Sequence, residues 1–270
     1  MELLPAPQVQ MERIMQVLRE TYALYGFYPL DTPLIESSEV LLAKGGGETE
    51  KQIYRFTKGD SDLSLRFDLT VPLAKYVAQH YGELTFPFRR FQIGKVYRGE
   101  RAQRGRFREF YQADIDVIGD GKLDIINEAE VPSIIYKTFT SLGLERFKIR
   151  INNRKVLNGF FAILGLTEKA GDVMRTIDKL EKIGIDNVKA ELMERGLDRE
   201  AVDKLQPILE LSGDNVQKLN QLKEVLAVSE TGMKGIEEME TVFGYVGRLG
   251  IDLTVELDLS LARGLNYYTG

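Results

Sequence analysis

The first half of the chain alternates between helical and extended hydrophobic patterns. A stripe of apolar residues at helical spacing predicts an amphipathic core helix over about residues 9–25: Met11, Ile14, Met15, Leu18, Tyr22 and Tyr25. Gly26 follows as a helix-ending residue. We expect an extended segment at 27–35 and a short amphipathic run at 37–43. Residues 52–57 and 63–68 then predict a strand pair.

Residues 88–119 predict two strands joined by a long polar loop. In the returning strand, apolar Tyr111, Ala113, Ile115 and Val117 alternate with Gln112, Asp114 and Asp116. The period of two places the three polar residues on one face of the sheet. Carboxylates on an inner face are costly unless a partner compensates them, so we expect such a partner.

The second half is mainly helical. We expect a helix to about residue 142 capped by Asp124 or Asn127, a strand at 147–151 and a helix at 156–164. Residues 168–229 form a charged helical run interrupted by Gly184, Gly196 and Gly213, which indicates an inserted helical subdomain with a solvated surface. A helix at 236–249 and an alternating strand at 251–258 complete the pattern.

The amino-acid composition limits which side chains could catalyse a reaction or bind a metal. The 270 residues include no cysteine and one histidine, which excludes disulfides, cysteine-based zinc sites, cysteine nucleophiles and multi-histidine metal sites. His80 lies where a helix ends and is predicted to be a cap. No apolar run approaches the ~20 residues that span a bilayer, and the start has no secretory pattern. Catalysis must therefore use arginine, acids, amides, Thr or Tyr.

Candidate chemistry gathers in three segments: Asp68 with Thr70, the 98–116 hairpin, and Arg263 with Tyr267 and Tyr268. Seven arginines lie between residues 88 and 119 of a chain with net charge −5: Arg89, Arg90, Arg98, Arg101, Arg104, Arg106 and Arg108. Guanidinium groups match phosphate and carboxylate oxygens. The residues favour a site for an anionic ligand that also carries a cationic part.

Plainer interpretations stay open for each of these features. Asp68 could only cap the helix that Thr70 begins, with Pro72 in its first turn. The arginines could pair with Glu100, Glu109 and Asp114 on a solvated loop. The run Gly45–Gly47 is not followed by Lys-Ser or Lys-Thr, so a flexible loop is favoured over a phosphate-binding loop.

The motifs resemble those of the histidyl-tRNA synthetases, which are class II aminoacyl-tRNA synthetases. The resemblance rests on a motif 1-like helix and strand (25–38), the hairpin sequence VYRGERAQRGRFREFYQADIDVIG, the segment LRFDLTVP and the closing LARGLNYYTG. It implies an α+β fold, with an antiparallel sheet flanked by helices. It also implies a catalytic core at 1–167 and 230–270, an inserted helical subdomain at 168–229, and a homodimer in the cytoplasm.

The resemblance also implies a reaction and its residues. Histidine and ATP, with Mg²⁺, form histidyl-adenylate, and the histidyl group passes to tRNA(His). The α-phosphate would contact Arg98 and Arg263, and Arg98 would also hold the histidine carboxylate. The remaining ATP contacts would be Glu100, Arg106, Arg108 and Phe110. The remaining histidine contacts would be Asp68, Thr70, Gln112, Asp116, Tyr267 and Tyr268, with no protein-bound metal.

Two departures from the family pattern qualify these expectations. Asn266 stands where the signature usually has aspartate, and class II motif 3 and the anticodon-binding domain are absent, so we expect a catalytic-domain fragment with weak or no activity alone. The runner-up is the synthetase-like regulatory subunit of ATP phosphoribosyltransferase, which binds histidine without aminoacylation. A synthetase-like scaffold or dimerisation module is the third alternative. The arginine set and the long insertion favour the synthetase.

Overall fold

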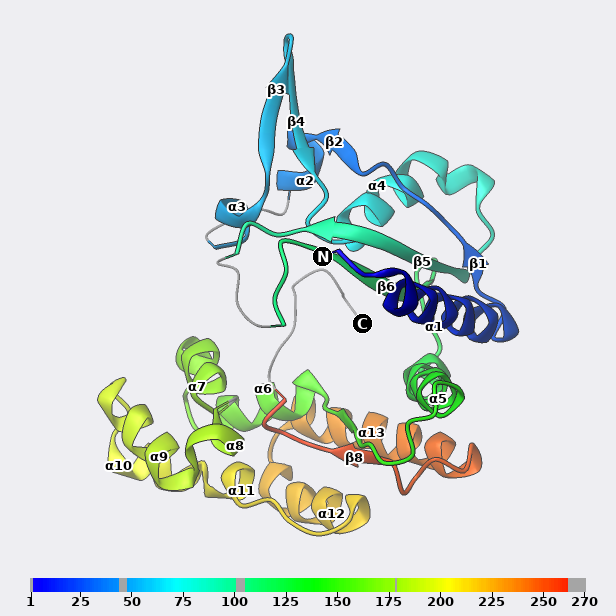
Figure 1. The fold of residues 1–270 in the computed structure, drawn as a ribbon. Helices are drawn as coiled ribbons and strands as arrows, with labels where there is room; N and C mark the ends of the chain where they lie inside the picture. The colour runs from blue at the N-terminus through cyan, green and yellow to red at the C-terminus, as the bar shows by residue number, and fades with distance from the viewer. Residues whose placement is uncertain (1, 44–47, 101–104, 178, 262–270) are drawn as a thin grey trace. The chain divides into compact units, whose positions relative to one another are not determined.

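The structure is a computed structural model that describes residues 2–43, 48–100, 105–177 and 179–261 (Figure 1). The chain divides into two compact units, Met1–Leu123 and Asp124–Gly270. No helix in the described ranges combines the length and apolar character that crossing a membrane requires.

The first unit combines two small sheets with helices. Its elements are α1 (Pro5–Leu24), β1 (Tyr28–Pro29), β2 (Ile35–Ser37), α2 (Ser38–Leu42), α3 (Glu48–Gln52), β3 (Arg55–Lys58), β4 (Ser61–Leu65), α4 (Thr70–His80), a 3-10 turn (Tyr81–Glu83), β5 (Phe88–Tyr97) and β6 (Glu109–Ile118). In α1 the predicted stripe is only partly buried: Met15 and Tyr22 lie inside, whereas Ile14 is exposed.

The long hairpin predicted at 88–119 is the main sheet of this unit. Strands β5 and β6 pair antiparallel along their whole length, from Phe88 opposite Ile118 to Tyr97 opposite Glu109. Strand β1 adds to β5 in the parallel direction. Tyr22 of α1 contacts Phe91 of β5 with ring centroids 5.6 Å apart, so α1 packs beside this sheet.

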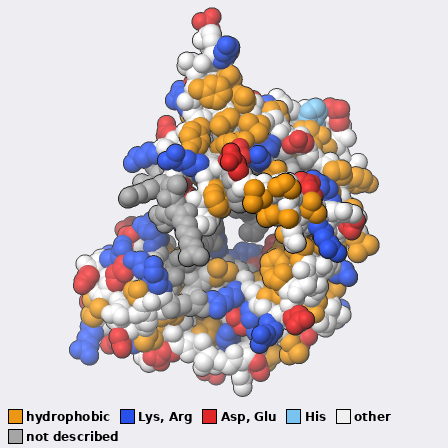
Figure 2. Space-filling model, in the orientation of Figure 1, with side chains coloured by type: hydrophobic (Ala, Val, Ile, Leu, Met, Phe, Trp, Pro, Cys, Tyr) orange, Lys and Arg blue, Asp and Glu red, His pale blue; other side chains and the backbone are white. Residues whose placement is uncertain are grey.

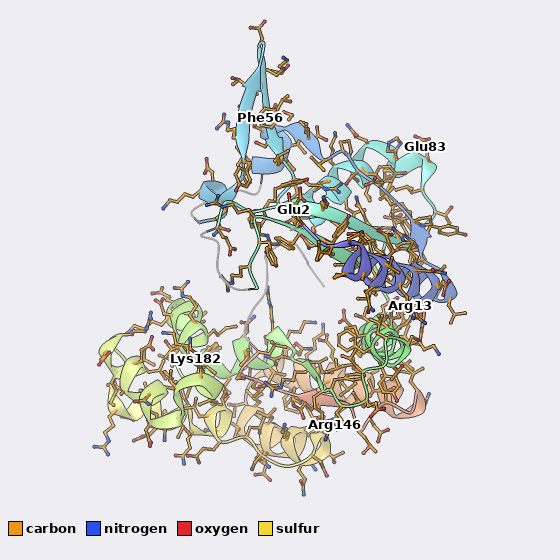
Figure 3. The ribbon with its side chains drawn as sticks, viewed as in Figure 1. Glu2, Arg13, Phe56, Glu83, Arg146 and Lys182 are labelled. Carbon is orange, nitrogen blue, oxygen red and sulfur yellow. The ribbon has the colours of Figure 1, made fainter. Side chains whose placement is uncertain are left out.

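The predicted strand pair before residue 68 is also confirmed. Strands β3 and β4 pair antiparallel around a tight turn at Gly59, and β2 joins the other edge of β4. Arg55 and Asp62 form an ion pair across this hairpin. Figure 3 labels Phe56 on β3, near the tip of the hairpin.

The second unit is mostly helical. Its elements are α5 (Ile126–Ser141), β7 (Ile149–Ile151), α6 (Arg154–Ile163), a 3-10 turn (Thr167–Lys169), α7 (Ala170–Ile177), α8 (Leu180–Ile183), α9 (Ile185–Glu194), α10 (Arg199–Lys204), α11 (Gln206–Leu209), α12 (Asn215–Leu226), α13 (Glu230–Arg248) and β8 (Val255–Leu257). Asp124 caps α5, accepting a hydrogen bond from the Ile126 amide at 2.9 Å.

The predicted glycine breaks in the helical run are confirmed. Gly184, Gly196 and Gly213 all have positive φ angles, which a residue with a side chain rarely adopts. Lys/Arg and Asp/Glu side chains are intermixed on the visible surface of these helices (Figure 2). One apolar cluster extends from α6 through these helices to α13. The boundaries 168–229 of an inserted subdomain stay a prediction.

The alternating segment 251–258 is shorter as a strand than its pattern predicts. Only Val255–Leu257 is strand, paired parallel with β7, and residues 252–254 form a turn. Leu253 is exposed, because this turn carries the chain out of helix α13 before the strand begins. Alternation alone did not reveal where pairing starts.

Helices α6 and α13 approach closely at glycine. A Cβ atom at position 159 would lie 2.5 Å from Gly232 Cα and 2.6 Å from Gly232 N. These are backbone atoms, so neither helix can yield by a simple side-chain rotation. We expect Gly159→Ala to destabilise the second unit by about 1–3 kcal/mol, as overpacking of tight cores does.

Urea unfolding followed by circular dichroism measures this loss. Gly244→Ala is the matched control, because Gly244 lies in α13 with no atom within 4 Å of its missing Cβ. Alanine there should be neutral or stabilising, since glycine weakens helix interiors. Equal stability of Gly159→Ala and Gly244→Ala would contradict a tight α6–α13 contact.

Candidate functional site

One face of the β5–β6 hairpin is polar although it is covered. Arg90 and Gln92 of β5 share this face with Gln112, Asp114 and Asp116 of β6. The register places Arg90 opposite Asp116, Gln92 opposite Asp114, and Gly94 opposite Gln112. Among the described residues, the buried charged side chains all belong to the first unit: Arg66, Asp68, Arg90 and Asp116. Buried charge of this density is typical of functional sites.

Arg90 is the partner that the acidic face requires. Its guanidinium is fully buried, and Nη2 lies 2.8 Å from Asp116 Oδ2. Nη2 also donates to the carbonyl oxygen of Leu69 at 3.3 Å. The ion pair therefore connects both strands of the hairpin to the segment that leads into α4.

Asp68 serves as a helix cap and retains an unused oxygen. Its Oδ1 accepts hydrogen bonds from the backbone amides of Thr70 at 3.1 Å and Val71 at 3.0 Å. Its Oδ2 is buried without a hydrogen-bond partner among the described residues. The side chain is only 3% exposed. The plainer interpretation, a helix cap, therefore holds for Oδ1, and capping leaves the other carboxylate oxygen for another donor.

Gln112 presents a second acceptor of the same kind. Its Nε2 lies 3.4 Å from both oxygens of Asp114, while its Oε1 is buried and has no hydrogen-bond partner in the described part of the chain. Burying an unsatisfied acceptor costs about 1–3 kcal/mol. Two such acceptors in one unit indicate a ligand that donates hydrogen bonds.

Burial and neighbouring charge perturb Asp114. Desolvation, and then the charge of Asp116, raise the pKa of Asp114 to about 6. Asp68 acts in the same direction, whereas Arg90 and the Gln112 amide oppose the shift. Burial and the charge of Asp114 raise the pKa of Tyr22 to about 12. The Asp114 carboxyl group is therefore poorly solvated, and its ionisation lowers the free energy of unfolding.

We expect Asp114→Asn to stabilise the protein at neutral pH by about 1–3 kcal/mol, allowing for partial exposure. With a folded pKa of about 6, above its unfolded value, Asp114 binds a proton in the native state that the unfolded chain has lost. Stability therefore falls as the pH rises from about 4 to about 6. Urea unfolding across this range measures the gain, which should vanish near pH 4.

Asp62→Asn provides a control of opposite sign. The hydrogen bond from Arg55 lowers the pKa of Asp62. The stability that ionised Asp62 contributes is therefore present at neutral pH and is lost as the pH falls. This variant should lose stability at neutral pH. An Asp114→Asn protein no more stable than the unaltered one at neutral pH would contradict the desolvation argument.

A second buried arginine, Arg66, lies against the same face at Gly94. Arg66 is 4% exposed and donates through Nε to the Lys95 carbonyl at 2.7 Å and through Nη1 to the Thr32 carbonyl at 2.6 Å. Gly94 admits it, because a Cβ there would lie 2.5 Å from Arg66 Nη2. Arg66 therefore fixes the connection between β4 and Asp68 against β5.

Arg98 follows β5 at the edge of this face. Its guanidinium carbon lies 4.5 Å from the ring centroid of Phe67 and 5.1 Å from that of Phe110. Its Nε donates to the Phe67 carbonyl at 3.3 Å. Stacking and this hydrogen bond hold the planar group in one orientation.

The tip of the hairpin is more exposed. Arg106 lies 3.3 Å from Glu100 in an ion pair, and Arg108 is exposed. Exposed pairs of this kind contribute little to stability, so a ligand can replace them at low cost. The structure thus brings Glu100 and Arg106 together, and Arg98 and Phe110 together.

Some predicted residues lie outside the described ranges. Arg263, Tyr267 and Tyr268 are among them, as are Arg101, Arg104 and the Gly45–Gly47 run. His80 ends α4, as predicted, with Nδ1 3.1 Å from Glu83 Oε1. No group of three or more His, Cys, Asp or Glu side chains in the described ranges is arranged to hold a metal ion.

The sequence pattern placed Asp114 on this face with Gln112 and Asp116, but it did not identify Arg90 as their partner, and it gave no role to Arg66. A usable signal existed, because Arg90 and Gln92 alternate with apolar Phe91 and Ile93. Only the register of the two strands reveals that Arg90 faces Asp116.

Comparison with known proteins shows the family of this chain. The model of the histidyl-tRNA synthetase family matches residues 1–270. The histidine–tRNA ligase of Clostridium tetani is 56% identical over 271 residues, which cover 100% of this chain and 62% of that protein. The chain belongs to the histidyl-tRNA synthetase family. It spans less than two thirds of the length of this relative.

Solved structures agree with the family and with the fold. The histidyl-tRNA synthetase of Nostoc sp. PCC 7120 is 41% identical with a TM-score of 0.90, covering 100% of this chain and 62% of that one. The predicted α+β class II synthetase fold is thus confirmed. An ATP phosphoribosyltransferase regulatory subunit/histidyl-tRNA synthetase from Bacillus halodurans C is 23% identical with a TM-score of 0.83 over 100% of this chain and 69% of that one, and shares the fold.

Proposed function

We propose that this member of the histidyl-tRNA synthetase family activates histidine with ATP and transfers it to tRNA(His). The observation that carries the proposal is the pair of buried acceptors without partners, Asp68 Oδ2 and Gln112 Oε1, in the same unit as the stacked guanidinium of Arg98. An amino acid offers an ammonium group to the acceptors and a carboxylate to the arginine, so both features match one ligand.

In the first step, a carboxylate oxygen of histidine attacks the α-phosphorus of ATP. A bond forms between these atoms, and the bond from the α-phosphorus to the bridging oxygen breaks, so pyrophosphate leaves. Negative charge gathers on the phosphate oxygens in the transition state. Arg98 would stabilise this charge with little rearrangement, because Phe67 and Phe110 already orient its guanidinium.

The rest of the nucleotide would be held at the tip of the hairpin. We assign the adenine to Glu100 and Phe110, and the outer phosphates to Arg106 and Arg108. Binding would require Arg106 to exchange Glu100 for phosphate, an inexpensive step for an exposed pair. Mg²⁺ is proposed to arrive with the ATP phosphates, and no step here depends on a metal site of the protein.

The histidine would lie on the polar face. Asp68, Thr70 and Gln112 are assigned to the ammonium group, and Asp116 is assigned to the imidazole. The ion pair with Arg90 supports this assignment, since it fixes the Asp116 carboxylate in one place. Arg263 on the phosphate and Tyr267 and Tyr268 in the histidine pocket are assigned from the family resemblance alone.

The test is histidine-dependent exchange of labelled pyrophosphate into ATP by the full-length protein. We expect exchange with L-histidine and none with phenylalanine, which lacks the ring nitrogens that Asp116 would recognise. Tight histidine binding without exchange would instead favour the regulatory subunit of ATP phosphoribosyltransferase. The absence of both would contradict the two proposals together.

The oligomeric state, the location in the cell and the domain division are also part of the proposal, and all three rest on the family resemblance. A homodimer in the cytoplasm is what the family resemblance implies. The division into a core at 1–167 and 230–270, with a helical insertion at 168–229, belongs to the same proposal. Gel filtration combined with light scattering tests the dimer.

A further inference from the structure

The orientation of the Gln112 amide depends on Asp114. An ionised carboxylate only accepts hydrogen bonds, so the end of the amide that faces it must be the NH₂ group. Nε2 of Gln112 lies 3.4 Å from each Asp114 oxygen. The amide oxygen is then directed away from Asp114, where it is buried and has no partner among the described residues.

Asp68 and Gln112 belong to the same face of the hairpin. Leu69, next to Asp68, has its Cδ2 3.7 Å from the position that a Cβ on Gly94 would occupy, and Gly94 is the register partner of Gln112. The charge of Asp68 also contributes to the raised pKa of Asp114. The two acceptors without partners therefore belong to the same face of this short stretch of sheet.

We propose that Asp114 is a positioning residue for substrate selection: it turns Gln112 so that the amide oxygen, together with Asp68 Oδ2, accepts from the ammonium group of the bound amino acid. This inference rests on the proposed function. With the amide reversed, the NH₂ group would face the ammonium group, and the ligand would lose one acceptor. Asp114 thus acts through Gln112 and does not touch the substrate.

The inference explains why a destabilising carboxyl is present on this face. Ionised Asp114 costs folding free energy, because it is poorly solvated and lies near Asp116 and Asp68. A residue that orients a binding group at a cost in stability is a common compromise in enzymes. The two effects predict opposite signs: removing Asp114 should raise stability and lower the affinity for histidine.

The test compares Asp114→Leu with the unaltered full-length protein. We expect the KM and the calorimetric Kd for L-histidine to rise about tenfold, the value of one oriented hydrogen bond. The KM for ATP and kcat should change little, since the phosphate contacts are intact. For Asp114→Asn, the KM and Kd for histidine should lie between those of the unaltered protein and of Asp114→Leu, because the asparagine amide oxygen can still accept from Gln112. Glu109→Leu, on the same strand but the opposite face, should leave the KM for histidine unchanged.

A double-mutant cycle separates positioning from a general structural effect. In a Gln112→Met background there is no amide to orient, so Asp114→Leu should cost no further histidine affinity. An equal loss in both backgrounds, or no loss in the single variant, would overturn the inference while the proposed function stands. An unaltered protein that binds no histidine would overturn the proposed function and this inference with it.

Discussion

Replacing Arg98 by lysine is expected to lower histidine-dependent ATP–pyrophosphate exchange by about 10²–10³-fold, the usual loss when one oriented donor to the transition state is removed. Lysine keeps the positive charge but lacks the planar group that stacks against Phe67 and Phe110. It also loses the two-point grip on phosphate oxygens. The effect should appear in kcat, because the charge gathers in the transition state, and also in the KM for histidine, whose carboxylate Arg98 is proposed to hold.

Arg55→Lys is the matched control for this experiment. Arg55 is an exposed arginine on β3 that pairs with Asp62 and takes no part in the proposed site. Its replacement should leave the exchange rate unchanged. An Arg98→Lys protein that exchanges pyrophosphate within an order of magnitude of the unaltered protein would remove Arg98 from the catalytic step.

Replacing Arg90 by methionine is expected to destabilise the protein by about 3–5 kcal/mol at neutral pH, as removal of one partner from a buried ion pair usually does. The guanidinium is fully buried against Asp116, and Asp114 and Asp68 add negative charge nearby. Methionine fills similar space but leaves that charge without its cation. Urea unfolding followed by circular dichroism measures the loss.

The double variant Arg90→Met with Asp116→Leu is the informative comparison. Removing both charges also removes the desolvation cost, so most of the lost stability should return. The double variant should nevertheless show a raised KM for histidine if Asp116 contacts the imidazole. A single variant as stable as the unaltered protein would show that the ion pair does not hold this face together.

Local pattern predicted most of the elements in the first unit. The alternation in 110–118 predicted β6 and its polar face, since side chains on a strand alternate regardless of what they pair with. Capping of α4 by Asp68 was one of two open interpretations, and it depends only on neighbouring backbone amides. Interactions that span a few residues are readable from the sequence for this reason.

Exposure and strand ends were harder to predict. Ile14 belongs to the apolar stripe of α1 but is exposed, because one face of a helix is buried only as far as neighbouring elements cover it. Residues 252–254 alternate as a strand does but form a turn. Pairing with β7 sets the start of β8, and that partner lies more than a hundred residues away.

The sequence by itself determined that the chain is an α+β protein of the histidyl-tRNA synthetase family, with an arginine-rich hairpin that has an acidic face. Only the tertiary structure decided which arginine neutralises that face. It also showed that Asp68 and Gln112 each keep a buried acceptor without a partner among the described residues. Alternation assigns residues to faces, but register and burial depend on contacts between distant segments. The roles of Arg90 and Asp114 follow from those contacts.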